Sequence, residues 1–367
     1  MLPNPYPYFA QLPDPRRETK NKLHKLEDII MIVLCSVLSG IEDWVGMETF
    51  AEEREDWFRG FLELPSGIPS HDTLSSVMGR LNPEAFRKDF MSWVEEALPS
   101  LVGQHVALDG KTLRGSRGAA GPVHLMSAFV SEARWLLVQL SVAGKANEIT
   151  AIPELLDRLD LRGATVTIDA IGCQKDIAKK IVEGGADYVL ALKSNHPQLH
   201  EDVELWLGAE AAKGRGAVKE TVEKDHGRIE TRRYGLSDVL AWLDTRQGWA
   251  GLHAVGMVEA QRESSGKVSV ERRYYLCSFN NLEYFADSVR AHWSIENQQH
   301  WVLDVQFGED RNRTRINHAP ENLALIRRMA LNLVRQNGNP KESIKRRRLR
   351  ASLNDGYRWQ LLTGTST

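Results

Sequence analysis

A polar stripe between residues 290 and 304 is the part of the sequence best suited to chemistry. Four titratable side chains follow one another there at four-residue spacing: His292, Glu296, His300 and Asp304. Residues four apart lie on the same face of a helix, so a helix over this stretch would carry all four in one line. Such a line is costly to bury unless its members are paired or hold a metal ion. The stretch is therefore the first candidate for a catalytic or metal-binding element.

Two aspartates are the partners expected for Glu296. Asp109 follows the apolar run 105–108 and Asp169 follows the apolar run 164–168, so each is predicted to end a buried strand. In neighbouring parallel strands, groups at the carboxyl ends project into one crevice. Each aspartate alone is equally well explained as a turn residue. Together with Glu296, they favour a shared carboxylate site.

The three carboxylates would repel one another at one point, and each would raise the pKa of the others. A divalent cation removes that cost, and oxygen ligands favour Mg²⁺ or Mn²⁺. Two such ions about 3.5–4 Å apart would activate an attacking oxygen and stabilise the leaving oxygen of a phosphodiester. The residues alone therefore predict metal-dependent phosphodiester chemistry, with Asp109, Asp169 and Glu296 as catalytic residues and metal ligands.

A zinc site is the alternative interpretation of the same stripe, with His292 and His300 as ligands beside Glu296. The helical zinc motif places two histidines four residues apart, with a glutamate next to the first. Here the histidines are eight residues apart and the glutamate lies midway, so the match is poor. Donation to a DNA phosphate is the other chemical role open to His292. Trp293 suits the core better than stacking on a base.

The elements that must position these residues follow from the apolar pattern. The first hundred residues predict helices, among them Leu26–Leu38 and a helix opened by Asn82-Pro83-Glu84, where Asn can cap and Pro suits the first turn. From Gly103 onward, short apolar runs alternate with helical patterns, which predicts a mixed α/β sheet with helices on its faces. Short alternating runs then predict a β-rich insertion before Glu296.

These patterns divide the chain into five expected segments. They are a helical amino-terminal domain for DNA binding or dimerisation (1–102), the first part of a catalytic core (103–208), the β-rich insertion (209–281), the last part of the core with the Glu296 helix (282–340), and a basic tail (341–367). The end of the tail, past Gly356, is expected to be loosely ordered.

Composition limits the class of protein. The 367 residues are 42% hydrophobic and 26% charged, which is ordinary for a soluble globular protein. Three isolated cysteines have neither metal-site nor disulfide spacing and fit a reducing cytosol. The apolar run Ile29–Leu38 is too short to span a bilayer and has acidic neighbours, which favours a buried helix over a signal peptide. We therefore expect a cytoplasmic protein without a membrane partner.

Positive charge is concentrated near the carboxyl end. Residues 311–350 contain 12 Lys and Arg against two Glu, a net charge of +10 in a chain whose total is −2. Such asymmetry favours a basic face for a polyanion, although a solvated charged helix would have the same composition. The candidate DNA-binding residues in this region are Lys345, Arg346, Arg347 and Arg348.

Five motifs resemble those of the DDE transposases, in particular the H-repeat-associated insertion-sequence transposases. They are Leu-Asp-Gly-Lys-Thr-Leu-Arg-Gly (108–115), Lys-Ala-Asn-Glu-Ile (145–149), Thr-Ile-Asp-Ala-Ile-Gly-Cys-Gln (167–174), Tyr-Val-Leu-Ala-Leu-Lys-Ser-Asn (188–195) and the run from His-Trp-Ser-Ile-Glu to Phe-Gly-Glu-Asp (292–310). Asp-Pro-Arg (14–16) and Gly-Ile-Pro-Ser-His-Asp-Thr (67–73) resemble the helical domain that precedes the catalytic domain in that subgroup. The resemblance extends over nearly the whole chain.

The resemblance implies an RNase H-like α/β core, preceded by a helical domain and interrupted by the β-rich insertion. It assigns the two aspartates to Asp109 and Asp169 and the glutamate to Glu296, holding two Mg²⁺ or Mn²⁺ ions. It implies a transposase that cuts double-stranded DNA at insertion-sequence ends and transfers the 3′-hydroxyl into target DNA, as a homodimer in the synaptic complex and nucleoid-associated when bound. A metal-dependent nuclease without strand joining and an inactive DNA-binding remnant stay open as alternatives.

The Glu296 helix departs from the wider family pattern. In related transposases this helix also carries a Tyr, an Arg and a Lys, and the matching positions here are Val289, His292 and Leu303. The resemblance therefore does not assign the residues that bind the phosphate next to the cleaved bond. The candidates are Lys111, Arg114, Lys193, Asn195, Arg290, His292 and His300.

Overall fold

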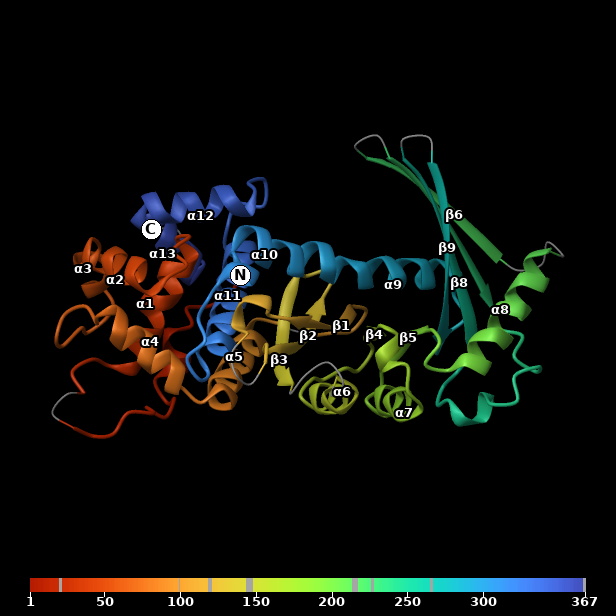
Figure 1. The fold of residues 1–367 in the computed structure, drawn as a ribbon, viewed down its shortest axis with the longest axis horizontal. Coiled ribbons are helices and arrows are strands. Elements are labelled where there is room, and N and C mark those ends of the chain that lie inside the picture. Colours follow the sequence, from red (N-terminus) through yellow and green to blue (C-terminus); the bar gives the residue numbers. More distant parts are fainter. Residues whose placement is uncertain are drawn as a thin grey trace.

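The computed structural model describes residues 1–19, 22–98, 100–117, 121–142, 148–212, 217–225, 228–264 and 267–365. The first three residues of the motif at 145–149 lie outside this part of the chain. The molecule is elongated, with helices at one end, a sheet and its covering helices in the middle, and long strands at the other end (Figure 1). None of the described helices is both long and apolar enough to cross a membrane.

The amino-terminal part is helical, as predicted. Its elements are the 3₁₀ turn η1 (Tyr6–Phe9), α1 (Leu26–Leu38), α2 (Trp44–Glu52), α3 (Glu55–Arg59), α4 (His71–Arg80) and α5 (Pro83–Ala97). Every residue of α1 except Glu27 is buried, which explains why its sequence is apolar on all sides. The side chain of Asn82 accepts hydrogen bonds from the first backbone N–H groups of α5, so the predicted cap is present.

A single mixed sheet of nine strands runs through the rest of the described chain. The strands are β1 (His105–Thr112), β2 (His124–Val130), β3 (Trp135–Val142), β4 (Thr165–Ile168), β5 (Asp187–Leu192), β6 (Ala217–Asp225), β7 (Arg228–Ser237), β8 (Ala254–Ser264) and β9 (Lys267–Cys277). Their spatial order is β3-β2-β1-β4-β5-β9-β8-β7-β6. β1, β4 and β5 are parallel, and the other neighbours are antiparallel. The predicted mixed α/β sheet is therefore confirmed.

The β-rich insertion continues this sheet. β9 pairs with β5 from Val189↔Cys277 to Leu192↔Tyr274, so β6–β9 extend the sheet beyond its parallel centre. A helix that the apolar pattern did not reveal, α8 (Pro197–Ala212), leads into the insertion. In Figure 1 the long strands β6, β8 and β9 rise past one end of α9 (Leu282–Ser294).

Helices cover both faces of the parallel strands. α6 (Glu148–Asp157) and α7 (Lys175–Glu183) lie on one face. On the opposite face lies a long helix made of α9 (Leu282–Ser294), a π-helical turn (Ile295–His300) and α10 (Trp301–Gln306) (Figure 1). This long helix carries the polar stripe across the sheet.

The last helices connect the two ends of the chain. α11 (Ala319–Gln336) contacts α1, α4, α5 and β3, and one hydrophobic core includes residues from all of these elements. The helical part and the sheet therefore share one core. The domain division at residue 102 stays a prediction.

The tail is an ordered part of the fold. It forms α12 (Ile344–Leu353) and α13 (Asp355–Thr363), and α13 packs against α1 and α11. Leu361 and Leu362 are fully buried. The side chain of Asn354 caps α13 by accepting from the N–H of Tyr357. The expectation of loose order past Gly356 was wrong, because these two leucines bury an apolar face that the short sequence did not single out.

Candidate active site

Asp109 lies inside β1 and does not end it. β1 continues to Thr112 because it stays paired with the antiparallel strand β2 up to that residue. The parallel pairing with β4, in contrast, stops at Leu108↔Ile168. The predicted strand end was therefore wrong, but Asp109 and Asp169 are still the first residues beyond the paired section of two parallel strands. That is the position from which side chains enter a common crevice.

Asp169 follows β4 directly and shapes the turn after it. Its Oδ1 atom accepts a hydrogen bond of 3.1 Å from the N–H of Ile171 and so caps the 3₁₀ turn η4 (Ala170–Gly172). The side-chain amide of Asn195 donates to the carbonyl of Ala170 at 2.7 Å. Asn195 was predicted to contact DNA, and here it holds the loop that carries Asp169.

Glu296 lies on the π-helical turn. α9 ends at Ser294 and α10 begins at Trp301, with the turn between them. Such turns are rare and occur frequently at functional sites. The stripe predicted from α-helical spacing still faces the sheet, but its members have different partners. His292 contacts Thr167, Glu296 and His300 face Asp109, and Asp304 pairs with Lys111.

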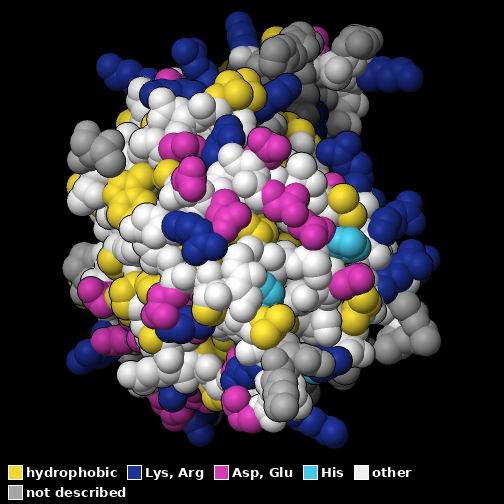
Figure 2. All heavy atoms as spheres, turned by 90° about the vertical axis from the view of Figure 1, so that its left-hand side faces the viewer, with side chains coloured by type: hydrophobic (Ala, Val, Ile, Leu, Met, Phe, Trp, Pro, Cys, Tyr) yellow, Lys and Arg dark blue, Asp and Glu magenta, His cyan; other side chains and the backbone are white. Residues whose placement is uncertain are grey.

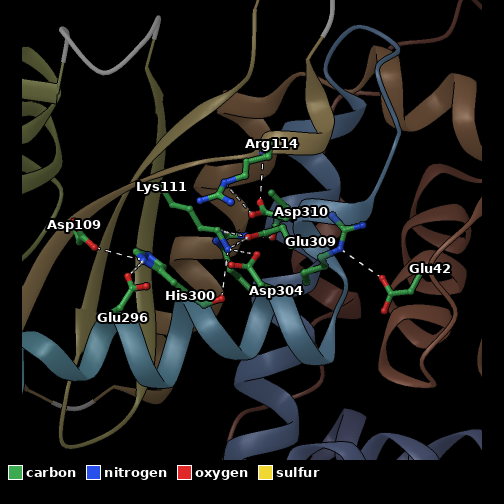
Figure 3. Close-up of polar contacts among 12 residues, drawn as sticks. Glu42, Asp109, Lys111, Arg114, Glu296, His300, Asp304, Glu309 and Asp310 are labelled. Carbon is green, nitrogen blue, oxygen red and sulfur yellow. Dashed lines mark hydrogen bonds and ion pairs between the residues drawn. The ribbon is translucent and has the colours of Figure 1, made fainter. Parts of the chain in front are cut away.

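Asp109, Glu296 and His300 converge on one point (Figure 3). The Nδ1 atom of His300 lies 3.1 Å from Oε2 of Glu296 and 3.4 Å from Oδ2 of Asp109. One ligand atom from each residue lies within 4.8 Å of the other two. The side chain of His300 is 5% exposed and that of Glu296 is 60% exposed, so the cluster opens to solvent on the glutamate side.

The electrostatics of this cluster favour a cation. The pKa of Asp109 is raised to about 6, first by burial and further by the carboxylates of Asp169 and Glu296. The pKa of Glu296 is lowered, first by its hydrogen bond with His300. His300 and the N–H of Gly110 oppose this rise in the pKa of Asp109, and a bound cation would favour its ionised form further. Two carboxylates and an imidazole within this span fit a divalent cation such as Mg²⁺ or Mn²⁺.

His292 does not share this site. Its Nδ1 atom lies 3.0 Å from the hydroxyl of Thr167 on β4. Burial lowers the pKa of His292 to about 4, so the ring is uncharged near neutral pH. The zinc alternative needed both histidines at one point and is therefore wrong. His292 holds α9 on the sheet instead of offering a positive charge to a phosphate.

Lys111 is buried in an ion-pair network. Its Nζ atom lies 2.5 Å from Asp304 and 3.0 Å from Glu309 (Figure 3). Glu309 is also paired with Arg328. Asp109 and Lys111 are two residues apart on β1, so they point to the same face. The network therefore joins β1 to α10 and α11. The prediction that Lys111 contacts DNA is corrected, because its side chain is 8% exposed and neutralised within the protein.

The other candidate DNA-binding residues divide by exposure. Arg347 donates to the carbonyl of Val334 at 2.8 Å, and Arg348 pairs with Glu42 at 2.7 Å. Both arginines are buried, as is His300, so these three predictions are also corrected. The candidates at the surface are Arg114, Lys193, Asn195, Arg290, Lys345 and Arg346. Arg290 is ion-paired with Glu223.

The basic carboxyl-terminal region does not make a uniformly basic face. Four of its arginines are buried: Arg327, Arg328, Arg347 and Arg348. Figure 2 shows the end of the molecule formed by the amino-terminal helices, where Asp and Glu side chains lie near the centre and Lys and Arg mainly toward the edges. Part of the excess positive charge in this region is therefore neutralised by ion pairs inside the protein.

Comparison with known proteins decides the family. A family model described as "Transposase DDE domain" matches residues 101–333, and one described as "DDE_Tnp_1-associated" matches residues 6–94. The chain belongs to the DDE transposase family. The fold class is therefore confirmed as an RNase H-like α/β core with a helical amino-terminal part and a β-rich insertion.

Relatives of this transposase place it in the predicted subgroup. The "Putative transposase YncI" of Escherichia coli O157:H7 is 39% identical, over 98% of this chain and 94% of the relative. The "H repeat-associated putative transposase YhhI" of Escherichia coli K12 is 35% identical, over 98% and 97%. The "Uncharacterized protein in dhlA 3'region" of Xanthobacter autotrophicus is 51% identical, over 76% and 95%. The H-repeat-associated assignment is therefore confirmed.

Proposed function

We propose that this transposase cuts phosphodiester bonds at insertion-sequence ends and joins the released 3′-hydroxyl to target DNA. The observation that carries the proposal is the convergence of Asp109 and Glu296 beside Asp169, where the pairing of two parallel strands ends. The family supplies the DNA context. The carboxylates supply the charge that metal-dependent phosphodiester chemistry needs.

Asp109, Asp169 and Glu296 are the proposed ligands of two Mg²⁺ or Mn²⁺ ions. When bound, such ions would activate the attacking oxygen and stabilise the leaving oxygen. Asp109 would hold an ion from a fixed position, since its strand is paired on both sides. Glu296 is ionised near neutral pH because its pKa is lowered. Its exposure lets a DNA backbone approach from that side.

Two surface cations, Lys193 beside Asp169 and Arg114 beside Asp310, are the proposed phosphate contacts. Lys193 is exposed and lines a hollow with Asp169 and Trp293. Arg114 follows β1 and its side chain is 84% exposed. The proposed partners are double-stranded element ends and target DNA, with two copies of the chain acting on paired ends and cytoplasmic protein associating with the nucleoid when bound.

Substitution of each carboxylate tests the catalytic assignment. Asp109→Asn, Asp169→Asn and Glu296→Gln are each expected to slow cleavage of a labelled element end by about a thousandfold or more, because several kcal/mol of charge stabilisation are lost. A mobility-shift assay should find DNA binding retained. Asp287→Asn is the control, since Asp287 is exposed on the same long helix. A carboxylate variant that cuts at the wild-type rate would remove that residue from the site.

Strand joining is tested separately from cutting. The wild-type chain is expected to insert a pre-cut end with a free 3′-hydroxyl into a plasmid. A chain that cuts but never joins is a nuclease, and a chain that binds DNA without either reaction is an inactive remnant.

A further inference from the structure

His300, on the π-helical turn, differs from the buried histidines of the sheet in how its ring is bonded. In His105 and His124, both ring nitrogens make side-chain hydrogen bonds. His300 makes side-chain contacts through Nδ1 alone, to Asp109 and Glu296. Its Nε2 atom is buried and has no hydrogen-bond partner among the described residues. The ring therefore meets the two carboxylates through Nδ1, which keeps a free lone pair when the proton is on Nε2.

The π-helical turn fixes the direction of this ring. Glu296 and His300 both lie in the turn, which packs against β1. The carbonyl of His300 also lies 3.4 Å from Nζ of Lys111, which is itself tied to Asp304. The imidazole is thus held by a helix and a strand, as a preorganised ligand requires.

The spacing of the donor atoms suits an ion between them. Ligand atoms at right angles around an ion with bonds of about 2.1 Å are about 3 Å apart. The measured separations from Nδ1 of His300 are 3.1 Å to Glu296 and 3.4 Å to Asp109. Both separations are close to that value, so small side-chain adjustments would let these donor atoms hold a cation.

We propose that Nδ1 of His300 is a metal ligand, which makes the site at Asp109 and Glu296 a mixed nitrogen–oxygen site that favours Mn²⁺ over Mg²⁺. Mg²⁺ takes oxygen ligands in a near-ideal octahedron, whereas imidazole suits transition metals. The inference rests on the metal site of the proposed function. It adds a ligand outside the Asp-Asp-Glu set and a preference between the two ions.

Electron spin-echo spectroscopy of the full chain loaded with Mn²⁺ tests the bond directly. The wild type is expected to give the ¹⁴N modulation of a coordinated imidazole, and His300→Asn is expected to lose it. His292→Asn is the matched control, because His292 lies on the same long helix but faces Thr167. Labelling the wild-type histidines with ¹⁵N should change the modulation without any substitution, which covers the case of a variant that does not fold.

Metal titration tests the preference. His300→Asn is expected to weaken Mn²⁺ binding at least about tenfold and Mg²⁺ binding much less, so the Mn²⁺ preference falls. Equal weakening of both ions would mean that the ring only positions the carboxylates, and would overturn the proposal.

The outcomes separate this inference from the proposed function. If Mn²⁺ binds and Asp109→Asn abolishes binding, but no nitrogen coupling is seen, only the role of His300 fails. If the wild type binds neither ion at this site, the metal-dependent function fails with it.

Discussion

At the scale of single residues, the charged side chains beside the candidate site form ion pairs with one another. Glu309 is fully buried between Arg328 and Lys111. Burial by itself would raise the pKa of Glu309, but the guanidinium of Arg328 and the ammonium of Lys111 outweigh it and lower the pKa to about 2. Glu309 was not singled out from the sequence, because a glutamate after a glycine resembles a turn residue until its partners are known.

Removing the charge of Glu309 should therefore destabilise the fold. Glu309→Gln is expected to lower the free energy of unfolding by about 3–5 kcal/mol, since Arg328 and Lys111 would be left buried without a counter-charge. Urea unfolding at pH 7 measures this change. Glu53→Gln, an exposed glutamate on the surface of the helical part, should change it by less than about 0.5 kcal/mol.

Measuring the stability of the wild type and of Glu309→Gln at several pH values gives a second test. The folded-state pKa of Glu309 lies below its ordinary value of 4.5, so its carboxylate contributes stability that is fully present above that value. That contribution is lost as the pH falls toward 2. The stability difference between the wild type and Glu309→Gln should shrink over this window, and a difference that stays constant would contradict the pairing.

At the scale of elements, the sequence patterns predicted the helices and strands whose bounds depend on their own residues. The apolar run Leu26–Leu38 became α1 residue for residue, and the helix opened by Asn82-Pro83-Glu84 begins at Pro83 as α5. The continuation of β1 beyond Asp109 was not predictable from its own residues, since the antiparallel partner β2 imposes it. The candidate site was recoverable as three carboxylates, but four-residue spacing could not reveal the π-helical turn that separates His300 from His292.

Shortening that turn tests whether it positions the ligands. Deleting Asn297 is expected to restore continuous α-helical geometry and to bring His300 from four positions to three positions after Glu296, which changes how the two side chains face each other. Mn²⁺ affinity should fall at least about tenfold, while circular dichroism should show helix content retained. Asn297→Ala keeps the residue count and should bind Mn²⁺ as the wild type does. Unchanged affinity in the deletion variant would mean that the turn does not set the site.

At the scale of the whole molecule, the carboxyl-terminal region joins the two ends of the chain at the helical end of the fold (Figure 1). Arg348 on α12 pairs with Glu42 and donates to the carbonyl of Val37, and Asn337 bonds to the backbone of Leu2. A run of consecutive basic residues was interpreted from sequence as a tail for a polyanion, because charge is visible in a sequence and burial is not. Only the cations left at the surface stay candidates for DNA binding.

The four basic residues 345–348 allow these two roles to be separated. Lys345 and Arg346 are exposed, whereas Arg347 and Arg348 are buried. Replacing the exposed pair with Ala should weaken DNA binding and reduce the slope of log K against log salt by about 0.9 for each phosphate that is no longer neutralised, with Tm unchanged. Replacing the buried pair should lower Tm, because Glu42 and the carbonyls of Val37 and Val334 lose their partners. Fluorescence anisotropy at several KCl concentrations measures the slope, and an unchanged slope for the exposed pair would remove this surface from the DNA path.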